Sequence, residues 1–181
     1  MTQDTTQIEI LTSDNIKDML SLQDTVIAFL KRYEQEHFII ERERAYFLRH
    51  VQSPSTIIGI RSDEGALIAQ GIFHHSERLN PDYIDGITLD SWKLCDKVST
   101  LQGVLVHPDF QGKGLMRTLI DFWMSWAQEN GYEHLLTRAE EHNTRSIHSF
   151  TKAGMLDVGT IIDARDNATV KVLHKRILHD G

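Results

Sequence analysis

The stretch Val104–Met116, VLVHPDFQGKGLM, constrains the fold of this chain more than any other segment. Its first three residues are apolar and two of them are β-branched, which predicts a strand covered on both faces. Pro108 ends the strand because proline has no N–H to donate to a neighbouring strand. Apolar residues then recur at helical spacing, at Leu115, Leu119, Phe122, Trp123 and Trp126. The sequence therefore predicts a buried strand, a short glycine-containing turn and a helix.

The turn between this strand and helix has the features of an anion-binding site. Gly112 and Gly114 allow the backbone to approach a ligand without an intervening side chain. The helix that follows points its free N–H groups at one spot, on the positive end of its dipole, which suits a phosphate. Lys113 adds a positive charge beside them. The alternative is an ordinary strand-to-helix turn in which the glycines serve the backbone geometry alone.

Two well-known phosphate-binding motifs are excluded by the residues present. A Walker A loop would require glycine in place of His107, and serine or threonine where Gly114 follows the lysine. A dinucleotide-binding fingerprint would require glycine in place of Arg117. The turn therefore belongs to neither of these classes.

The run V-x-V-x-P-x-x-Q-G-K-G in this stretch resembles the acyl-CoA loop of the GCN5-related N-acetyltransferases, the GNAT superfamily. The signature of that loop is Q/R-x-x-G-x-G/A after a strand that ends in V-x-P. Gln111 and Gly114 match it, whereas Met116 replaces the usual small final residue and is large enough to crowd the pyrophosphate. The flexibility of methionine makes it the least harmful large residue there. The resemblance implies that acetyl-CoA is bound by Val104, Leu105, Val106, Gln111, Gly112, Lys113, Gly114, Leu115 and Met116, without a metal.

A second segment, Asn143–Met155, resembles the N-x-x-[AS]-x-x-x-Y-x-x-x-G-F motif of the same family. In that family the Asn contacts the pantetheine or a bound water, and the Tyr hydroxyl acts as general acid to the departing thiolate. Asn143, Ser146 and Gly154 match the motif, but Phe150 stands where the Tyr is expected. The resemblance implies that Asn143, Ser146 and Phe150 contact the coenzyme. General-acid assistance is typically worth about 10²–10⁴ in rate, so its loss slows the reaction without abolishing it.

The sequence leaves more than one candidate for the residue that removes the proton from the attacking amine. Relatives that acetylate lysine often carry Glu where this chain has Thr100, and those that acetylate protein N-termini often carry Glu where it has Arg138. Glu140, Glu141 and His142 follow close by, near the expected mouth of the site, and are the candidates for catalysis through a water molecule. The alternative is that they are ordinary solvated groups at the end of a strand.

The other elements complete an α/β fold (α+β mixed) with a central mixed, mostly antiparallel sheet flanked by helices. We expect strands at Ile8–Leu11, Thr56–Ile60, Ala66–Phe73, Ser99–Val106, His134–Ala139, Leu156–Asp163 and Ala168–Leu178. We expect helices at Ile16–Leu30, Glu41–His50, Leu115–Asn130 and Thr144–Ala153. Residues 74–97 are expected to form a long loop, either a lid or a structural loop pinned by Tyr83, Leu89 and Trp92. This order of elements matches the GNAT fold along nearly the whole chain, as one domain of residues 1–181.

The composition indicates which classes of partner and which cellular compartment to expect. The net charge of -7 argues against a nucleic-acid or membrane-surface binder. The single cysteine, Cys95, excludes an internal disulfide and fits a reducing compartment, so we expect a cytoplasmic protein. The N-terminus lacks a signal-peptide pattern. The spacing of the ten histidines, including His142 and His148, resembles no metal site, so we expect them to be exposed or hydrogen-bonded.

These observations lead to one main hypothesis and two alternatives. We expect an N-acetyltransferase in which a primary amine of a small-molecule or peptide acceptor attacks acetyl-CoA directly, since no cysteine is positioned as a nucleophile. A backbone N–H near Val106 would polarise the thioester carbonyl. The first alternative is a non-catalytic acyl-CoA-binding sensor, suggested by Phe150, Thr100 and Arg138. The second, an ATP-binding protein, is weakened by the lack of Ser or Thr after Lys113. Edge strands near the C-terminus offer a surface for a homodimer.

Overall fold

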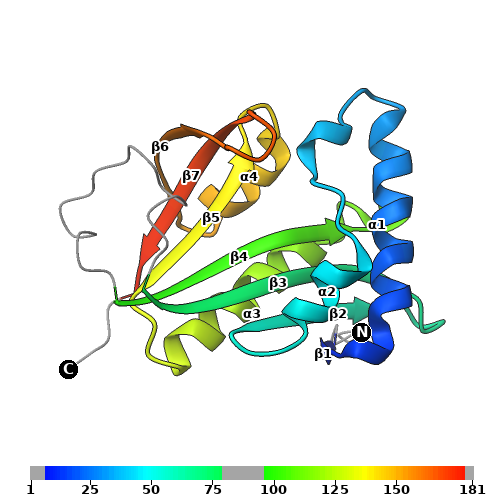
Figure 1. Ribbon diagram of the computed structural model, residues 1–181, viewed down its shortest axis with the longest axis horizontal. Coiled ribbons are helices and arrows are strands. Elements are labelled where there is room, and N and C mark those ends of the chain that lie inside the picture. The colour runs from blue at the N-terminus through cyan, green and yellow to red at the C-terminus, as the bar shows by residue number, and fades with distance from the viewer. Residues whose placement is uncertain (1–6, 79–95, 178–181) are drawn as a thin grey trace. The chain divides into compact units, whose positions relative to one another are not determined.

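The computed structural model describes residues 7–78 and 96–177, which form one seven-stranded sheet and four α-helices (Figure 1). The strands are β1 (Ile8–Leu11), β2 (Ser55–Arg61), β3 (Leu67–Arg78), β4 (Asp96–Val106), β5 (His134–Glu140), β6 (Leu156–Ile162) and β7 (Thr169–Arg176). The helices are α1 (Ile16–Lys31), α2 (Arg44–His50), α3 (Leu115–Glu129) and α4 (Thr144–Lys152). In these described ranges no helix has both the length and the apolar character needed to cross a membrane.

The strands follow the order β1-β2-β3-β4-β5-β7-β6 across the sheet. Strands β4 and β5 pair in parallel, whereas β1 with β2, β5 with β7, and β6 with β7 pair antiparallel. The predicted mixed, mostly antiparallel sheet flanked by helices is therefore confirmed. The chain divides into two compact units, residues 1–73 with 103–119 and residues 74–102 with 120–181.

Helix α1 supplies much of the core of the first unit. Before it, the Thr12 hydroxyl accepts from the N–H of Asp14 and the Asn15 side chain accepts from the N–H of Thr12, which completes a capping box. The buried face of the helix packs with Phe47, Ile57 and other apolar residues of this unit. That face consists of Ile16, Met19, Leu22, Gln23, Val26 and Ile27. Two residues of the predicted stripe, Leu20 and Leu30, are only partly buried and lie at its border.

Helix α2 begins at Arg44 and is shorter than the predicted helix Glu41–His50. The reason is a tertiary contact with α1. The side-chain amide of Gln23 donates to the carbonyl of Arg42 (2.9 Å) and accepts from its N–H (2.8 Å). With its backbone groups bound to this amide, Arg42 does not join the helix. The sequence pattern of this segment does not reveal such a distant partner.

The predicted hairpin of β2 and β3 is confirmed, but the predicted loop 74–97 is wrong at both ends. Strand β3 continues to Arg78 and β4 already begins at Asp96. The ring of His75 in β3 stacks on Trp126 of α3, with ring centroids 4.0 Å apart. The side chain that packs against the helix here is the polar His75. The sequence therefore lacks the alternating apolar residues that would predict a strand at this point. The proposed loop anchors Tyr83, Leu89 and Trp92, and also Cys95, lie outside the described residues.

In the second unit, β5 has different partners on its two sides. It pairs in parallel with β4 over Val98–Thr100 and His134–Leu136, and antiparallel with β7 along its whole length. Next to the parallel pairing, the Thr137 hydroxyl donates to the carbonyl of Leu101 over 2.8 Å. A side chain therefore binds the β4 carbonyl just beyond the paired residues.

A glycine follows each of the helices α3 and α4. Gly131 (φ 75°) follows α3 and Gly154 (φ 87°) follows α4, and both adopt the left-handed conformation of a helix C-cap. Helix α3 is also tied to the sheet within this unit, because the indole N–H of Trp123 donates to the Ser99 hydroxyl over 2.8 Å. Both groups are buried, so this hydrogen bond satisfies two polar atoms in the core.

Candidate active site

The first compact unit contains the strand, turn and helix predicted for Val104–Met116. Strand β4 ends just before His107, whose N–H donates to the carbonyl of Ile68 in β3 over 2.8 Å. The Nδ1 of His107 accepts from the N–H of Asp109 (3.2 Å) and caps the short 3-10 helix η4 (Pro108–Phe110). The ring of His107 therefore supports the turn through its Nδ1 atom.

The two glycines of the turn leave its backbone open. Gly112 (φ 76°) and Gly114 (φ 79°) adopt a conformation that other residues rarely adopt, and a Cβ atom on either would meet nothing within 4 Å. The first hydrogen bond of α3 runs from the N–H of Thr118 to the carbonyl of Gly114 (3.0 Å), so the preceding N–H groups serve no bond inside the helix. The ammonium of Lys113 lies 4.6 Å from the centre of the Phe110 ring. Exposed glycines at the start of a helix, with a cation nearby, fit a phosphate.

Strand β4 contains an irregularity that the sequence analysis did not anticipate. Gly103 lies inside the strand with φ 59°, and a Cβ atom there would come within 3.0 Å of the Ile72 side chain. A side chain there would be strained in this conformation and would press on Ile72, and a positive φ within a strand is typical of a bulge. A glycine inside the strand between Val98 and Val106 is the signal that would have predicted it.

The second unit contains the segment that begins α4. The Asn143 side chain accepts from the N–H of Ser146 (3.2 Å), which makes Asn143 the N-cap of this helix. Phe150 is 2% exposed, and its ring is part of the core of this unit. The position at which the resemblance implies a tyrosine hydroxyl is therefore occupied by a buried apolar ring without a proton to donate.

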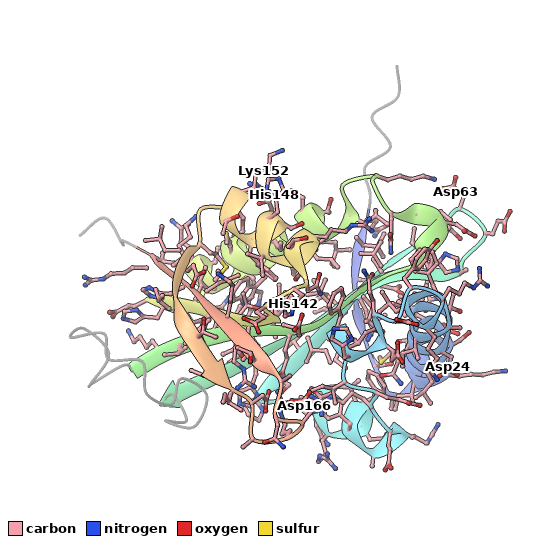
Figure 2. All side chains as sticks on the ribbon, turned by 90° about the horizontal axis from the view of Figure 1, so that it is seen from above. Asp24, Asp63, His142, His148, Lys152 and Asp166 are labelled. Atoms are coloured by element: carbon pink, nitrogen blue, oxygen red, sulfur yellow. The ribbon has the colours of Figure 1, made fainter. Side chains whose placement is uncertain are left out.

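Glu140, Glu141 and His142 lie together at the end of β5, as the sequence predicts. The Nδ1 of His142 is 2.9 Å from Oε1 of Glu140, and the His142 N–H donates to Oε2 of the same carboxylate (2.7 Å). This hydrogen bond, with the charge of Glu140, raises the pKa of His142 above its ordinary value of 6.5. One ligand atom from each of the three residues lies within 4.8 Å of the others. Figure 2 shows His142 apart from His148 and Lys152, which lie one turn apart on α4.

Thr100 and Arg138 occupy the positions where relatives often carry a catalytic Glu. In this structure the first is packed in the interior and the second is part of an ion pair. Thr100 is buried. The guanidinium of Arg138 lies 3.4 Å from Oδ2 of Asp163, which also accepts from the Arg165 guanidinium. The other oxygen of Asp163, Oδ1, accepts from the backbone N–H and the Nε–H of Arg165. The Arg165 contacts, aided by Arg138, lower the pKa of Asp163 to about 2 although burial opposes this. The sequence analysis missed Asp163, and only the Asp-x-Arg spacing at the end of β6 hinted at a turn.

A mixed sheet whose β4 strand runs into an open, glycine-containing turn is the arrangement expected of an acyl-CoA-dependent N-acyltransferase. The model of the acetyltransferase (GNAT) family matches residues 20–155, so the chain belongs to this family. The family catalyses acetyl transfer, and its enzymes use acetyl-CoA. Among curated proteins, none matches the sequence.

Solved structures share this fold along nearly the whole chain. The ribosomal-protein-S18-alanine N-acetyltransferase from Escherichia coli superimposes with a TM-score of 0.71 at 14% identity, over 97% of this chain and 96% of its own. An N-acetyltransferase from Staphylococcus aureus Mu50 gives 0.69 at 17% identity, over 94% and 96%. The protein yncA from Salmonella typhimurium, solved with its cofactor acetyl-CoA, gives 0.67 at 14% identity, over 97% and 95%. At these identities the likeness establishes the fold alone.

Proposed function

We propose that this protein transfers the acetyl group of acetyl-CoA to a primary amine of a small-molecule or peptide acceptor by direct attack, without a metal. The observation that carries the proposal is the turn at Gly112 and Gly114, which has open space in front of both glycines and lies at the start of α3 beside Lys113. Acetyl-CoA supplies an acetyl group activated as a thioester. The steps below concern only what the residues of this chain contribute.

Two segments of the chain are proposed to contact the coenzyme. In the first unit the phosphates bind the turn and the start of α3, and the pantetheine arm runs along the end of β4. These residues are Val104, Leu105, Val106, Gln111, Gly112, Lys113, Gly114, Leu115 and Met116. In the second unit we propose contacts from Asn143, Ser146 and Phe150. Asn143 also caps α4, so its side chain already has one fixed orientation.

In the proposed reaction the lone pair of the amine forms the new C–N bond while the C–S bond breaks and its electron pair leaves with sulfur. The N–H of His107 points to β3, and N–H groups alternate sides along a strand, so the N–H of Val106 points away from β3. It is available to polarise the thioester carbonyl. Phe150 has no proton to donate, but a thiol of pKa near 8.5 is a tolerable leaving group without an acid.

The proton lost by the amine is proposed to pass through water to the cluster of Glu140, Glu141 and His142. The support is geometric, since the three groups converge within 4.8 Å at the end of β5. The raised pKa of His142 shows that Glu140 stabilises a positive charge on that ring. The pair of Glu140 and His142 can therefore accept one proton and hold it.

Further proposals concern the assembly and the compartment. We propose that residues 1–181 act as one domain and that two copies pair through β6, the last strand of the sheet. Leu156 and Ile162 of this strand are 68% and 67% exposed, which supports such a contact. The single cysteine supports the cytoplasm, and the net charge of -7 supports an acceptor that is neither a nucleic acid nor a membrane.

A second candidate function is a non-catalytic acyl-CoA sensor. It is favoured by the buried Phe150 ring, and by Arg138, which is held in an ion pair with Asp163 instead of providing a base. A sensor would bind acetyl-CoA without turning it over.

Calorimetric titration with acetyl-CoA, CoA and ATP tests the shared part of both functions. We expect micromolar binding of acetyl-CoA and of CoA, and no heat from ATP. Thiol release in the presence of a panel of primary amines then separates the two. Amine-dependent release supports the transferase, whereas binding without any release supports the sensor. Absence of CoA binding would contradict both.

A further inference from the structure

Two histidines that are 40 residues apart in the chain lie side by side on neighbouring strands, His134 on β5 and His174 on β7 (Figure 1). The Nδ1 of His134 is 3.1 Å from the Nε2 of His174. The two rings are nearly parallel, with 23° between their planes and 5.4 Å between their centres. Both residues belong to the second compact unit. The acetyl transfer proposed above uses neither of them, so the pair is a separate feature.

The register of the sheet places both rings on one face. His134 lies opposite Arg176 on β7, and His174, two residues before Arg176, projects from the same side because side chains alternate along a strand. The intervening Lys175 points to the other side, where its ammonium donates to the carbonyl of Ala153 after α4 (3.1 Å). Since β7 pairs with β5 along the whole of β5, the backbone fixes the distance between the two rings.

The separation of the two facing nitrogen atoms fits a shared metal ion. With metal–nitrogen bonds of about 2.0–2.1 Å, two imidazoles on one ion have their nitrogens about 2.9 Å apart at a right angle and about 3.3 Å apart at the tetrahedral angle. The 3.1 Å between Nδ1 of His134 and Nε2 of His174 lies between these values. A rotation of the two rings brings both lone pairs onto one ion without any change in the spacing of the strands.

The protonation state of the pair also suits a metal ion, because imidazole binds metals in its neutral form. Burial, followed by the neighbouring His134, lowers the pKa of His174 to about 4. Burial also lowers the pKa of His134. Both rings are therefore neutral at pH 7. When an ion binds, the ring that donates the N–H between them gives up this proton and takes one up at its other nitrogen, so the pair stays neutral.

One positive and one negative side chain act on the pair. Arg176 lowers the pKa of His134 and so disfavours a cation, whereas Glu133 raises that pKa and favours one. On the β6 side, His174 lies opposite Leu156, which is uncharged and 68% exposed. The pair therefore borders solvent on this side, which gives an ion from solution a route to it.

We propose that His134 and His174 together bind one divalent transition-metal ion of the kind that imidazole prefers, Zn²⁺ or Cu²⁺. Within residues 7–78 and 96–177, no carboxylate or thiol lies close enough to both rings to complete a group of three. Water fills the remaining coordination positions. The ion links β7 to β5 and stabilises the second compact unit. This site is independent of the proposed acetyl transfer, since none of the residues assigned to that reaction takes part in it.

The direct test is calorimetric titration of the full chain with Zn²⁺ at pH 7. We expect a site with a dissociation constant in the micromolar range. His174→Gln should weaken it about tenfold or more, because loss even of a group behind a metal ligand costs that much. His148→Gln, on an exposed residue of α4, is the matched control and should bind Zn²⁺ like the wild type. Unchanged binding in His174→Gln would place the ion elsewhere and overturn the proposal.

NMR of the wild-type protein tests the same site without a substitution. As Zn²⁺ is added, the ring signals of His134 and His174 should shift together and stop changing at one equivalent, while those of His148 stay in place. Zn²⁺ should also raise the Tm of the wild type, because an ion that binds the folded state stabilises it, and a chelator should reverse the effect. Shifts confined to other histidines, with the signals of this pair unchanged, would refute the proposed site.

Discussion

The side-chain amide of Gln23 forms with the backbone of Arg42 the two hydrogen bonds that a neighbouring β-strand would form, at 2.9 and 2.8 Å. Gln23 is the one polar residue on the buried face of α1. This contact ends the irregular segment before α2. A single side chain thus links the packing of α1 to the point at which the next helix begins.

Replacing Gln23 by Leu is expected to destabilise the protein by about 2–4 kcal/mol. The change leaves both backbone groups of Arg42 without their partners, and an unpaired group costs about 1–3 kcal/mol when buried. Urea unfolding followed by circular dichroism measures the change. Gln52→Leu is the control, because its amide donates over 3.3 Å to Leu48 at an exposed site and its loss should be nearly neutral. Equal effects of the two changes would mean that the Gln23 contact is weak.

Gly114→Ala is expected to weaken acetyl-CoA binding tenfold or more. The new methyl group enters the open space in front of the turn, where we propose that a phosphate binds. Its backbone conformation (φ 79°) adds a penalty of about 1 kcal/mol to folding. Gly65→Ala is the matched control, since Gly65 also has a positive φ (83°) and open space around it, in the hairpin turn. Both variants should lose similar stability, and only Gly114→Ala should lose calorimetric affinity for acetyl-CoA.

Glu140→Gln is expected to move the pH–rate profile of acetyl transfer to lower pH. The hydrogen bond and charge of Glu140 are the largest causes of the raised pKa of His142, so without them that pKa returns toward 6.5. If this pair accepts the proton, kcat rises with pH through the same pKa. Glu141→Gln removes only the smallest cause and should shift the profile little. NMR follows the pKa of His142 directly. An unchanged pH–rate profile in Glu140→Gln would exclude Glu140 and His142 as the base.

Asp163→Asn is expected to destabilise the protein by roughly 2 kcal/mol at pH 7. Arg165 and Arg138 hold the pKa of Asp163 at about 2, below its ordinary value of 3.8. A lowered carboxylate pKa contributes stability that is present above about pH 4 and is lost as the pH falls through 2. Thermal unfolding at several pH values measures it. Asp166→Asn, in the same turn, keeps an oxygen that can accept from the Ala168 N–H and should have little effect.

His174→Gln is expected to reduce the acid sensitivity of the fold. The Nε2 of His174 lies 3.1 Å from the Nδ1 of His134 on β5, and burial together with this neighbour lowers the pKa of His174 to about 4. Because this pKa lies below the ordinary 6.5, stability is lost as the pH falls from 6.5 to about 4. The variant should lose less in that window than the wild type, by about 2–3 kcal/mol. His148→Gln, on an exposed residue of α4, should keep the wild-type slope in urea unfolding.

Local chemistry explains which elements the sequence predicts well. The capping box of Thr12 and Asn15 begins the 3-10 helix η1 (Ser13–Asn15) just before α1, Gly131 follows the end of α3, and Gly112 with Gly114 shapes the turn before α3, all through interactions within a few residues. Periodicity and caps of this kind are encoded in neighbouring side chains. The same applies to the Asn143 cap of α4, which both family resemblance and helix-capping rules indicate.

Contacts between distant residues decided what the sequence left open. The hydrogen bond from Gln23 to Arg42 accompanies the later start of α2. His75, which stacks on Trp126, lies in the end of β3 that the sequence predicts as loop. The ion pair with Asp163 accounts for the position of the Arg138 side chain. By itself the sequence determined the order of the elements, the family and the glycine-containing turn after β4, because each depends on residues adjacent in the chain. Only the tertiary structure decided which polar side chains pair, since such partners lie 19 residues apart for Gln23 and Arg42 and no local pattern identifies them.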